Sequence, residues 1–183
     1  MEFKQRLRHR RLTRLKEYDY SKPGGYFITI CTKNRSCFLG EIDNDRMILN
    51  HYGEIVRLSW LELPEHYHNV ELDVFVIMPN HIHGIIFLKD VGAGLKPAPT
   101  VSSYHCFALP EIIRAFKTFS SRKINEHRNT SGTSVWQRNY YDHVIRKDES
   151  LEQIREYIVT NPLRWALDRE NPANLRQKSF ACP

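Results

Sequence analysis

Apolar and polar residues alternate along the chain in a pattern that predicts both strands and helices. Aromatic and β-branched residues fill 26–32, 70–78 and 83–88, which is typical of strands on a half-buried pleated surface. The last two runs are separated by Pro79-Asn80, a dipeptide that breaks regular structure. We therefore predict that they form an antiparallel hairpin whose second strand begins with two histidines.

Shorter strands are expected elsewhere in the chain. Strand-like residues lie near 38–39 and 47–49 with a turn at 43–45 between them, and a further strand is expected near 140–145. Glycine and proline interrupt the pattern over 91–100, so we predict a flexible loop reaching to about residue 104 rather than a domain boundary.

Apolar residues recur at helical spacing in three segments. The first covers 51–62 and is stopped by Pro64, and the second covers 110–127. The third begins at 147–150 and ends or kinks near Asn161, because Pro162 disfavours helical geometry in the residue before it. The expected buried faces are Ile55, Val56, Leu58 and Leu61 in the first helix, Ile112, Ile113, Phe116, Phe119 and Ile124 in the second, and Leu151, Ile154 and Ile158 in the third.

The composition favours one cytoplasmic domain. The chain has 183 residues, enough to bury a sizeable core, and no window approaches the ~18 apolar residues of a membrane span. Its first residues lack the features of a signal peptide. The four cysteines form no Cys-x-x-Cys pair, which argues against a zinc knuckle and against a disulfide scaffold.

The positive charge is concentrated at the N-terminus. The formal net charge is +6, and residues 1–16 contain seven basic residues and one acid, so the rest of the chain is balanced. The basic residues of this arm are Lys4, Arg6, Arg8, Arg10, Arg11, Arg14 and Lys16. Such an arm can track nucleic-acid phosphates, or it can be a solvated tail. The same two interpretations apply to Lys117, Arg122 and Lys123 on the helix 110–127, which we expect beside the candidate metal site.

The histidines after the Pro-Asn break are candidate metal ligands. Successive side chains of a strand point to opposite faces, so His81 and His83 share one face. They can grip one metal ion, or they can be two polar residues at a strand edge. The other His-x-His pair, His66 and His68, follows a proline in a polar connection and is expected in a surface loop.

A tyrosine and an asparagine on the third helix could complete a reactive centre. Tyr157 and Asn161 are four residues apart and share a helix face, and Asn161 is a plausible third metal ligand. A tyrosine phenol has a pKa near 10, so as a nucleophile it needs an electrophile activated by another group. A divalent cation on a phosphoryl oxygen provides that activation, which indicates phosphodiester cleavage. These arguments do not choose Tyr157 over Tyr140 or Tyr141.

Five motifs in order give the chain a specific resemblance to a known family. They are Tyr18-Asp19-Tyr20-Ser21, the run 26–32, Met78-Pro79-Asn80-His81-Ile82-His83-Gly84, Trp136-Gln137-Arg138 with Asp142-His143-Val144-Ile145-Arg146, and Ile154-Arg155-Glu156-Tyr157-Ile158 with Asn161-Pro162. From about residue 8 to 167 the chain closely resembles the REP-associated tyrosine transposases, a branch of the single-tyrosine HUH transposases.

The resemblance implies an α+β fold, a ferredoxin-like sandwich with a mainly antiparallel central sheet. It implies that His81 and His83 bind Mg²⁺ or Mn²⁺, that Tyr157 is the nucleophile and that Asn161 is the helix-borne polar ligand. The family cleaves single-stranded DNA near hairpins, leaves a 5′-phosphotyrosine link and a free 3′-OH, and rejoins strands by the reverse chemistry. Imidazole ligands alone would rather suit zinc, iron or nickel.

The expected organisation is a basic arm over 1–20, the transposase domain over 21–167 and a polar tail over 168–183. A homodimer and a monomer both remain open, as does the role of Asp142 and His143. One alternative function is a catalytically silent hairpin-binding protein derived from a transposase. Another is a metal-dependent nucleotide phosphoesterase that uses only the histidines.

Overall fold

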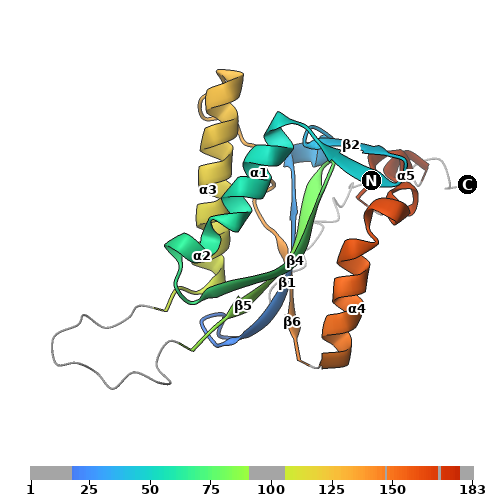
Figure 1. The fold of residues 1–183 in the computed structure, drawn as a ribbon. Coiled ribbons are helices and arrows are strands. Elements are labelled where there is room, and N and C mark those ends of the chain that lie inside the picture. The colour runs from blue at the N-terminus through green and yellow to red at the C-terminus, as the bar shows by residue number, and fades with distance from the viewer. Residues whose placement is uncertain (1–17, 91–105, 147, 169, 178–183) are drawn as a thin grey trace, which may run out of the picture.

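A four-stranded antiparallel sheet forms the centre of the protein. The computed structural model describes residues 18–90, 106–146, 148–168 and 170–177. The strands lie in the order β4-β5-β1-β6 (Figure 1). Their bounds are Gly24–Cys31 for β1, Val70–Met78 for β4, His81–Leu88 for β5 and Tyr141–Ile145 for β6. The predicted hairpin is therefore confirmed, with β5 beginning at the first histidine.

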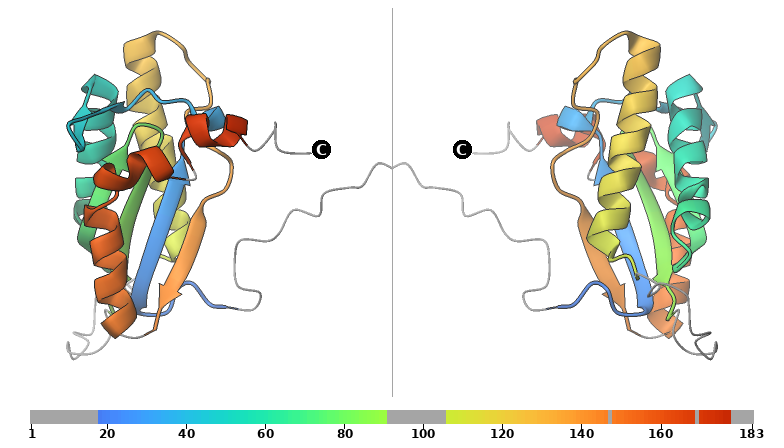
Figure 2. Two further views of the ribbon diagram at one scale, coloured as in Figure 1. Left: turned by 90° about the vertical axis from the view of Figure 1, so that its right-hand side faces the viewer. Right: turned by 90° about the vertical axis from the view of Figure 1, so that its left-hand side faces the viewer.

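Helices cover both faces of this sheet (Figures 1 and 2). One face carries α1 (His51–Leu61), α2 (Leu63–His66) and α3 (Leu109–Arg128), and the other carries α4 (Asp148–Val159). The path β1-α1-β4-β5-α3-β6, with that strand order, is the split βαβ arrangement of a ferredoxin-like sandwich. The predicted fold class is confirmed.

Smaller elements lie at the end of the sheet where β5 begins. A hairpin of β2 (Gly40–Asp43) and β3 (Arg46–Leu49) turns at Asn44 and Asp45, which both have positive φ. The expected strand at 38–39 is wrong, because the backbone amides of Phe38 and Leu39 instead donate to the Pro79 carbonyl. The remaining elements are η1 (Lys33–Arg35), η2 (Pro162–Leu167) and α5 (Pro172–Gln177).

Two hydrophobic clusters hold the layers together. The larger lies between the sheet and α1 and α3, and it includes the fully buried Trp60, Tyr26 and Phe116. The smaller lies under α4 around Phe27, Ile85 and Ile158. Neighbouring residues of β1 thus enter opposite clusters, which explains why this strand is apolar at nearly every position rather than alternating.

Three residues predicted to be buried are exposed. Leu58 and Leu61 lie outside the buried stripe of α1, which runs through Val56 and Trp60. Phe119 of α3 is also exposed and stacks on His66. The buried position beside Phe119 belongs to Ser120, whose hydroxyl accepts a hydrogen bond from the Trp136 indole at 2.9 Å.

Two predicted segments lie outside the described residues, namely the basic arm over 1–16 and most of the loop over 90–104. Within the described part of the chain, the helices are too short or too polar to cross a membrane.

Gly84 on β5 lets the sheet approach α1 closely. A Cβ atom at this position would lie 2.6 Å from Cζ2 of Trp60 and 3.1 Å from Cβ of Phe75. Because Trp60 is fully buried, it cannot swing away. We expect Gly84→Ala to lower the free energy of unfolding by about 1–3 kcal/mol, the usual cost of overpacking, in a urea titration. Ser131→Ala, at an exposed turn, is the control and should change it by less than about 0.5 kcal/mol. An unchanged urea midpoint for Gly84→Ala would contradict this packing.

Candidate metal and tyrosine centre

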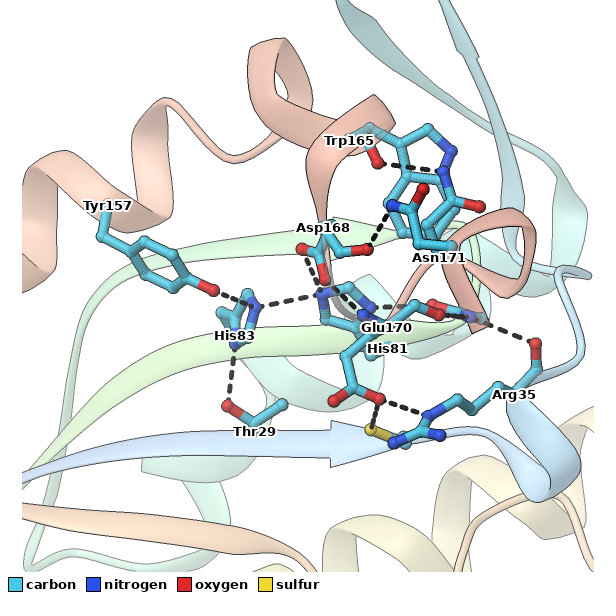
Figure 3. A network of polar contacts seen from close by, with 12 residues as sticks. Thr29, Arg35, His81, His83, Tyr157, Trp165, Asp168, Glu170 and Asn171 are labelled. Atoms are coloured by element: carbon cyan, nitrogen blue, oxygen red, sulfur yellow. Dashed lines mark hydrogen bonds and ion pairs between the residues drawn. The ribbon is translucent and has the colours of Figure 1, made fainter. Parts of the chain in front are cut away.

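Two buried histidines face each other at the start of β5. His81 is fully buried and His83 is 3% exposed, and both lie on the face of the sheet that α4 covers. Their Nε2 atoms are 3.0 Å apart (Figure 3). Two ligands in adjacent octahedral positions of a metal, each about 2.1 Å from it, would be about 3 Å apart. The spacing of the pair therefore fits a single divalent cation.

The amide of Asn80 determines which nitrogen of His81 carries the proton. Asn80 is fully buried, and its Nδ2 donates to the backbone carbonyls of Arg35 at 3.1 Å and Glu170 at 2.8 Å. With both donors directed at carbonyls, Oδ1 must face His81 Nδ1, which lies 2.8 Å away. That nitrogen is then the donor, so Nε2 of the neutral ring keeps its lone pair for a metal.

His83 is held from its other side by β1. The Oγ1 atom of Thr29 lies 2.8 Å from His83 Nδ1, and Thr29 is directly opposite His83 in the pairing of β1 with β5. The ring also stacks on Phe27, with centroids 5.4 Å apart. A metal-binding histidine commonly has its second nitrogen held by such a neighbour, which fixes the ring orientation.

Tyr157 lies next to this pair, in the same chain. Its hydroxyl is 3.4 Å from His83 Nε2 (Figure 3). Its ring meets Phe27 edge-on at 6.1 Å. The ring is 38% exposed, so a substrate can approach it. Tyr140 is largely buried, and Tyr141 lies on the other side of Phe27, whose ring it meets edge-on at 6.3 Å, so geometry favours Tyr157 where sequence reasoning left three candidates.

An ion pair fixes α4, and with it Tyr157, to the sheet. The register of β4 shifts between Leu72 and Phe75, and Asp73 lies within this bulge. Its Oδ2 accepts from Nε of Arg155 at 2.8 Å and from the same guanidinium's NH2 group at 2.6 Å. The contact to Asp73, followed by one to Glu152, raises the pKa of Arg155 above its ordinary value. Arg155 therefore stays charged and holds α4 in position.

The segment after η2 brings in an acidic group that sequence reasoning missed. Asp168 lies with Oδ2 3.9 Å from His81 Nε2, and its side chain is 5% exposed. Asp168, His81 and His83 together could hold a metal ion. Sequence reasoning treated 168–183 as a polar tail, because one aspartate without periodicity or a paired motif carries no signal.

Neighbouring contacts hold this segment in place. The buried Glu170 accepts from Arg35 Nε at 2.5 Å, and its backbone amide donates to Asp168 Oδ1 at 2.6 Å. Asn171 donates to the Trp165 carbonyl at 2.9 Å. The Asp168 carboxylate is therefore oriented before any ligand arrives.

Asn161, the predicted third ligand, lies two residues after the end of α4 and is 1% exposed. Its Oδ1 is buried and has no hydrogen-bond partner among the described residues. Buried polar atoms are nearly always satisfied, so this oxygen calls for a partner beyond the described residues. A cation or a bound ligand would provide one.

Of the basic residues predicted to contact nucleic acid, only those of α3 lie in the described part of the chain, and they are not at this centre. Arg6, Arg8, Arg10, Arg11 and Arg14 lie outside the described residues. Helix α3 packs on the opposite face of the sheet from the histidines, so the expectation that it lies beside the metal site is wrong. Its Lys117 donates to the Gln137 and Arg138 carbonyls, and Lys123 pairs with Glu62 at 2.9 Å. Arg122 is exposed.

A buried hydrogen bond gives Asp142 a structural role. The Tyr20 hydroxyl donates to Asp142 Oδ2 at 2.5 Å, so the segment before β1 is tied to the edge strand β6. Tyr20 also meets Tyr18 edge-on, and burial of Tyr26 beside them raises the pKa of Tyr26. The sequence motifs that contain Tyr20 and Asp142 are therefore hydrogen-bonded to each other. His143 is exposed on the other face of β6.

The chain is similar in sequence to known transposases. The family model described as "Transposase IS200 like" matches residues 100–161. An uncharacterized protein of Haemophilus influenzae is 42% identical over 175 residues, which cover 89% of this chain and 93% of that protein. A second Haemophilus influenzae protein, provisionally named a REP-associated tyrosine transposase, is 28% identical over 80% of this chain and 74% of its own length.

Among solved structures, the fold is similar to that of a REP-associated tyrosine transposase bound to a REP hairpin. The TM-score is 0.58 at 18% identity, and the match covers 82% of this chain and 73% of that one. At this identity the likeness concerns the fold.

The role of Asn80 can be tested through metal affinity. Loss of the amide in Asn80→Ala frees the His81 ring to rotate or to change tautomer, so we expect Mn²⁺ to bind about 10–100-fold more weakly by calorimetry. In the ¹⁵N spectrum the His81 nitrogens should lose their single-tautomer pattern. Asn125→Ala is the matched control, since Asn125 is also a buried amide that donates to a carbonyl, but from α3. It should cost stability and leave Mn²⁺ affinity unchanged. Equal affinity losses in the two variants would contradict the role of Asn80.

Proposed function

The chain belongs to the IS200-like transposases, in the REP-associated tyrosine branch, and we propose that it cleaves and rejoins single-stranded DNA at hairpin elements through a tyrosyl–DNA intermediate. One observation carries the proposal. The Tyr157 hydroxyl lies 3.4 Å from Nε2 of the buried His83, and Nε2 of His81 lies 3.0 Å from that nitrogen. A nucleophile and a pair of metal ligands are thus within reach of one phosphate.

The proposed reaction has two symmetrical steps. The Tyr157 oxygen attacks a backbone phosphorus, the bond to the 3′ oxygen breaks, and that oxygen takes up a proton as the phenol loses one. The product is a 5′-phosphotyrosine link and a free 3′-OH. In the reverse step a 3′-OH attacks the same phosphorus and releases the tyrosine. A bound Mg²⁺ or Mn²⁺ would polarise the phosphoryl oxygen and offset the charge that builds up there.

His81 and His83 are the proposed metal ligands, together with an oxygen from Asn161. Asn161 Oδ1 is buried and unsatisfied within the described chain, whereas Asp168 already accepts a backbone hydrogen bond. Asp168 is the second candidate for the oxygen ligand. Oxygen ligands and water around two imidazoles support an open site for Mg²⁺ or Mn²⁺ rather than a closed structural zinc site.

We propose that the basic arm and α3 contact the DNA away from the reacting phosphate. The arginines of 1–16 supply the charge that phosphate tracking needs. On α3 we assign a contact to Arg122, because Lys117 and Lys123 would first have to give up their partners in the protein. The Tyr157 hydroxyl lies 3.4 Å from His83 of the same chain, which supports catalysis by one subunit's own groups.

The alternative is a hairpin-binding protein that has lost catalysis. Its recognition surfaces would be the same, and the complete set of His81, His83, Tyr157 and Asn161 argues against it. A phosphoesterase that used only the histidines is the other alternative, and it would not require a tyrosine next to them.

Replacement of the proposed nucleophile should abolish the covalent link. With a labelled single-stranded hairpin and Mn²⁺, we expect Tyr157→Phe to form no denaturation-resistant adduct, a loss of at least about 10³-fold, while hairpin affinity stays within about twofold. Tyr52→Phe, which removes a hydroxyl from α1 on the opposite face of the sheet, should form adduct at the parental level. Adduct from Tyr157→Phe would refute the assignment. Hairpin binding by the parent chain without adduct in any divalent metal would favour the silent binder.

The third ligand can be identified by comparing two truncations. We expect Asn161→Ala to weaken Mn²⁺ binding about tenfold or more, measured by electron paramagnetic resonance of free Mn²⁺, since the cation loses an oxygen donor. Asp168→Ala should have the smaller effect. If Asp168→Ala instead weakens binding more than Asn161→Ala, Asp168 is the ligand and the assignment of Asn161 is wrong.

A further inference from the structure

A cavity beside the tyrosine centre has the chemistry of a nucleobase site. Resting on the proposed function, we infer that it receives one unstacked base of the DNA strand whose phosphate lies at Tyr157. The cavity measures about 230 Å³ and is lined by Thr29, Cys31, Arg35, Gln137, Asn139, Tyr140, Tyr141 and Glu170. It is thus smaller than the roughly 300–1,000 Å³ of sites for drug-sized ligands, as suits a single base.

Strand pairing places this cavity next to the histidines. Thr29 of β1 pairs with His83 on one side and with Tyr141 on the other, so the three lie in one row across the sheet. Neighbouring strands are about 4.8 Å apart, so Tyr141 is roughly 10 Å from His83 along this row. Thr29 both lines the cavity and contacts His83 at 2.8 Å. A nucleotide beside the reacting phosphate can therefore reach the cavity.

One wall of the cavity is an aromatic ring available for stacking. Tyr141 lies on the edge strand β6 and is 42% exposed. It meets Phe27 edge-on at 6.3 Å, and Phe27 in turn contacts Tyr157 at 6.1 Å. One phenylalanine thus separates the exposed ring from the proposed nucleophile. Exposed aromatic rings in this position are how proteins hold unstacked bases of single strands.

The rim of the cavity presents side-chain amides that can read a base edge. Neither Gln137 nor Asn139 makes a side-chain hydrogen bond within the described part of the chain. The backbone of Gln137 is fixed, because its amide donates to the Cys31 carbonyl at 2.9 Å and its own carbonyl accepts from Lys117. Side-chain amides have both donors and acceptors, which match the edges of bases.

The ion pair of Arg35 and Glu170 also lines the cavity. It favours a base over a phosphate, because the carboxylate already neutralises the guanidinium and the pair offers a second phosphate no net positive charge. A flat heteroaromatic ring with polar edges satisfies the aromatic wall, the amides and the ion pair together. The occupant we assign is accordingly a base and not a backbone group.

The inference is tested by coupling between the ring and one base. The probes are fluorescein-labelled hairpin oligonucleotides with single-stranded extensions on both sides, each with an abasic site at a different position. Affinity is measured by fluorescence anisotropy. The parent and all variants are full chains that carry Tyr157→Phe, so that no adduct forms. Tyr141→Leu removes stacking and keeps an apolar side chain against Phe27, and Tyr141→Phe keeps the ring.

We expect Tyr141→Leu to weaken binding of intact DNA about tenfold, as loss of one stacked base does, and Tyr141→Phe to bind like the parent. At one position beside the cleavage site, the abasic change should lower the affinity of the parent about tenfold and should not lower the affinity of Tyr141→Leu any further. If the losses add at every position, or if Tyr141→Leu binds like the parent, the inference is overturned. Should Tyr141→Leu fail to fold, Asn139→Ala is used in its place, since this exposed amide has no hydrogen bond to lose within the described chain.

A separate adduct assay distinguishes this inference from the proposed function. Adduct formation by the chain with an unaltered Tyr157, together with additive losses, would overturn the base site and leave the transposase chemistry intact. Coupling at one base without any adduct would support the site and overturn the catalytic proposal. Absence of any oligonucleotide binding would overturn both.

Discussion

β1 and β5 pair from Gly24 opposite Leu88 to Cys31 opposite His81, and this register determines where the two histidines lie. It puts Thr29 against His83 and sends both histidines to the face under α4. A slip of one residue would turn the histidines into the larger core and expose Ile82 and Ile86 to the site. Because β5 is buried on both faces, such a slip would cost much stability, and the register is strongly specified.

Much of the fold follows from local patterns in the sequence. The Pro79-Asn80 break between two apolar runs predicted the central hairpin, and helical spacing predicted α1, α3 and α4 to within about two residues at most ends. The histidine pair could also be placed on one face, because strand geometry alone requires it. Patterns failed where packing decides, as with Phe119, which has an apolar side chain but sits beside the position that Ser120 fills.

The supporting contacts of the site could not be predicted in this way. Asn80 reaches carbonyls of Arg35 and Glu170, which are 45 and 90 residues away in the sequence. Tyr20 and Asp142 are 122 residues apart. No periodicity encodes such pairs, because they depend on how finished elements meet. The choice of Tyr157 among neighbouring tyrosines likewise needed the position of α4 against the sheet.

The 3.4 Å approach of Tyr157 to His83 occurs within a single polypeptide. Bringing these two groups of one chain together is therefore a first-order event governed by folding. Dilution does not separate two groups that one folded chain holds in contact. This contact should accordingly be made as fully in a dilute sample as in a concentrated one.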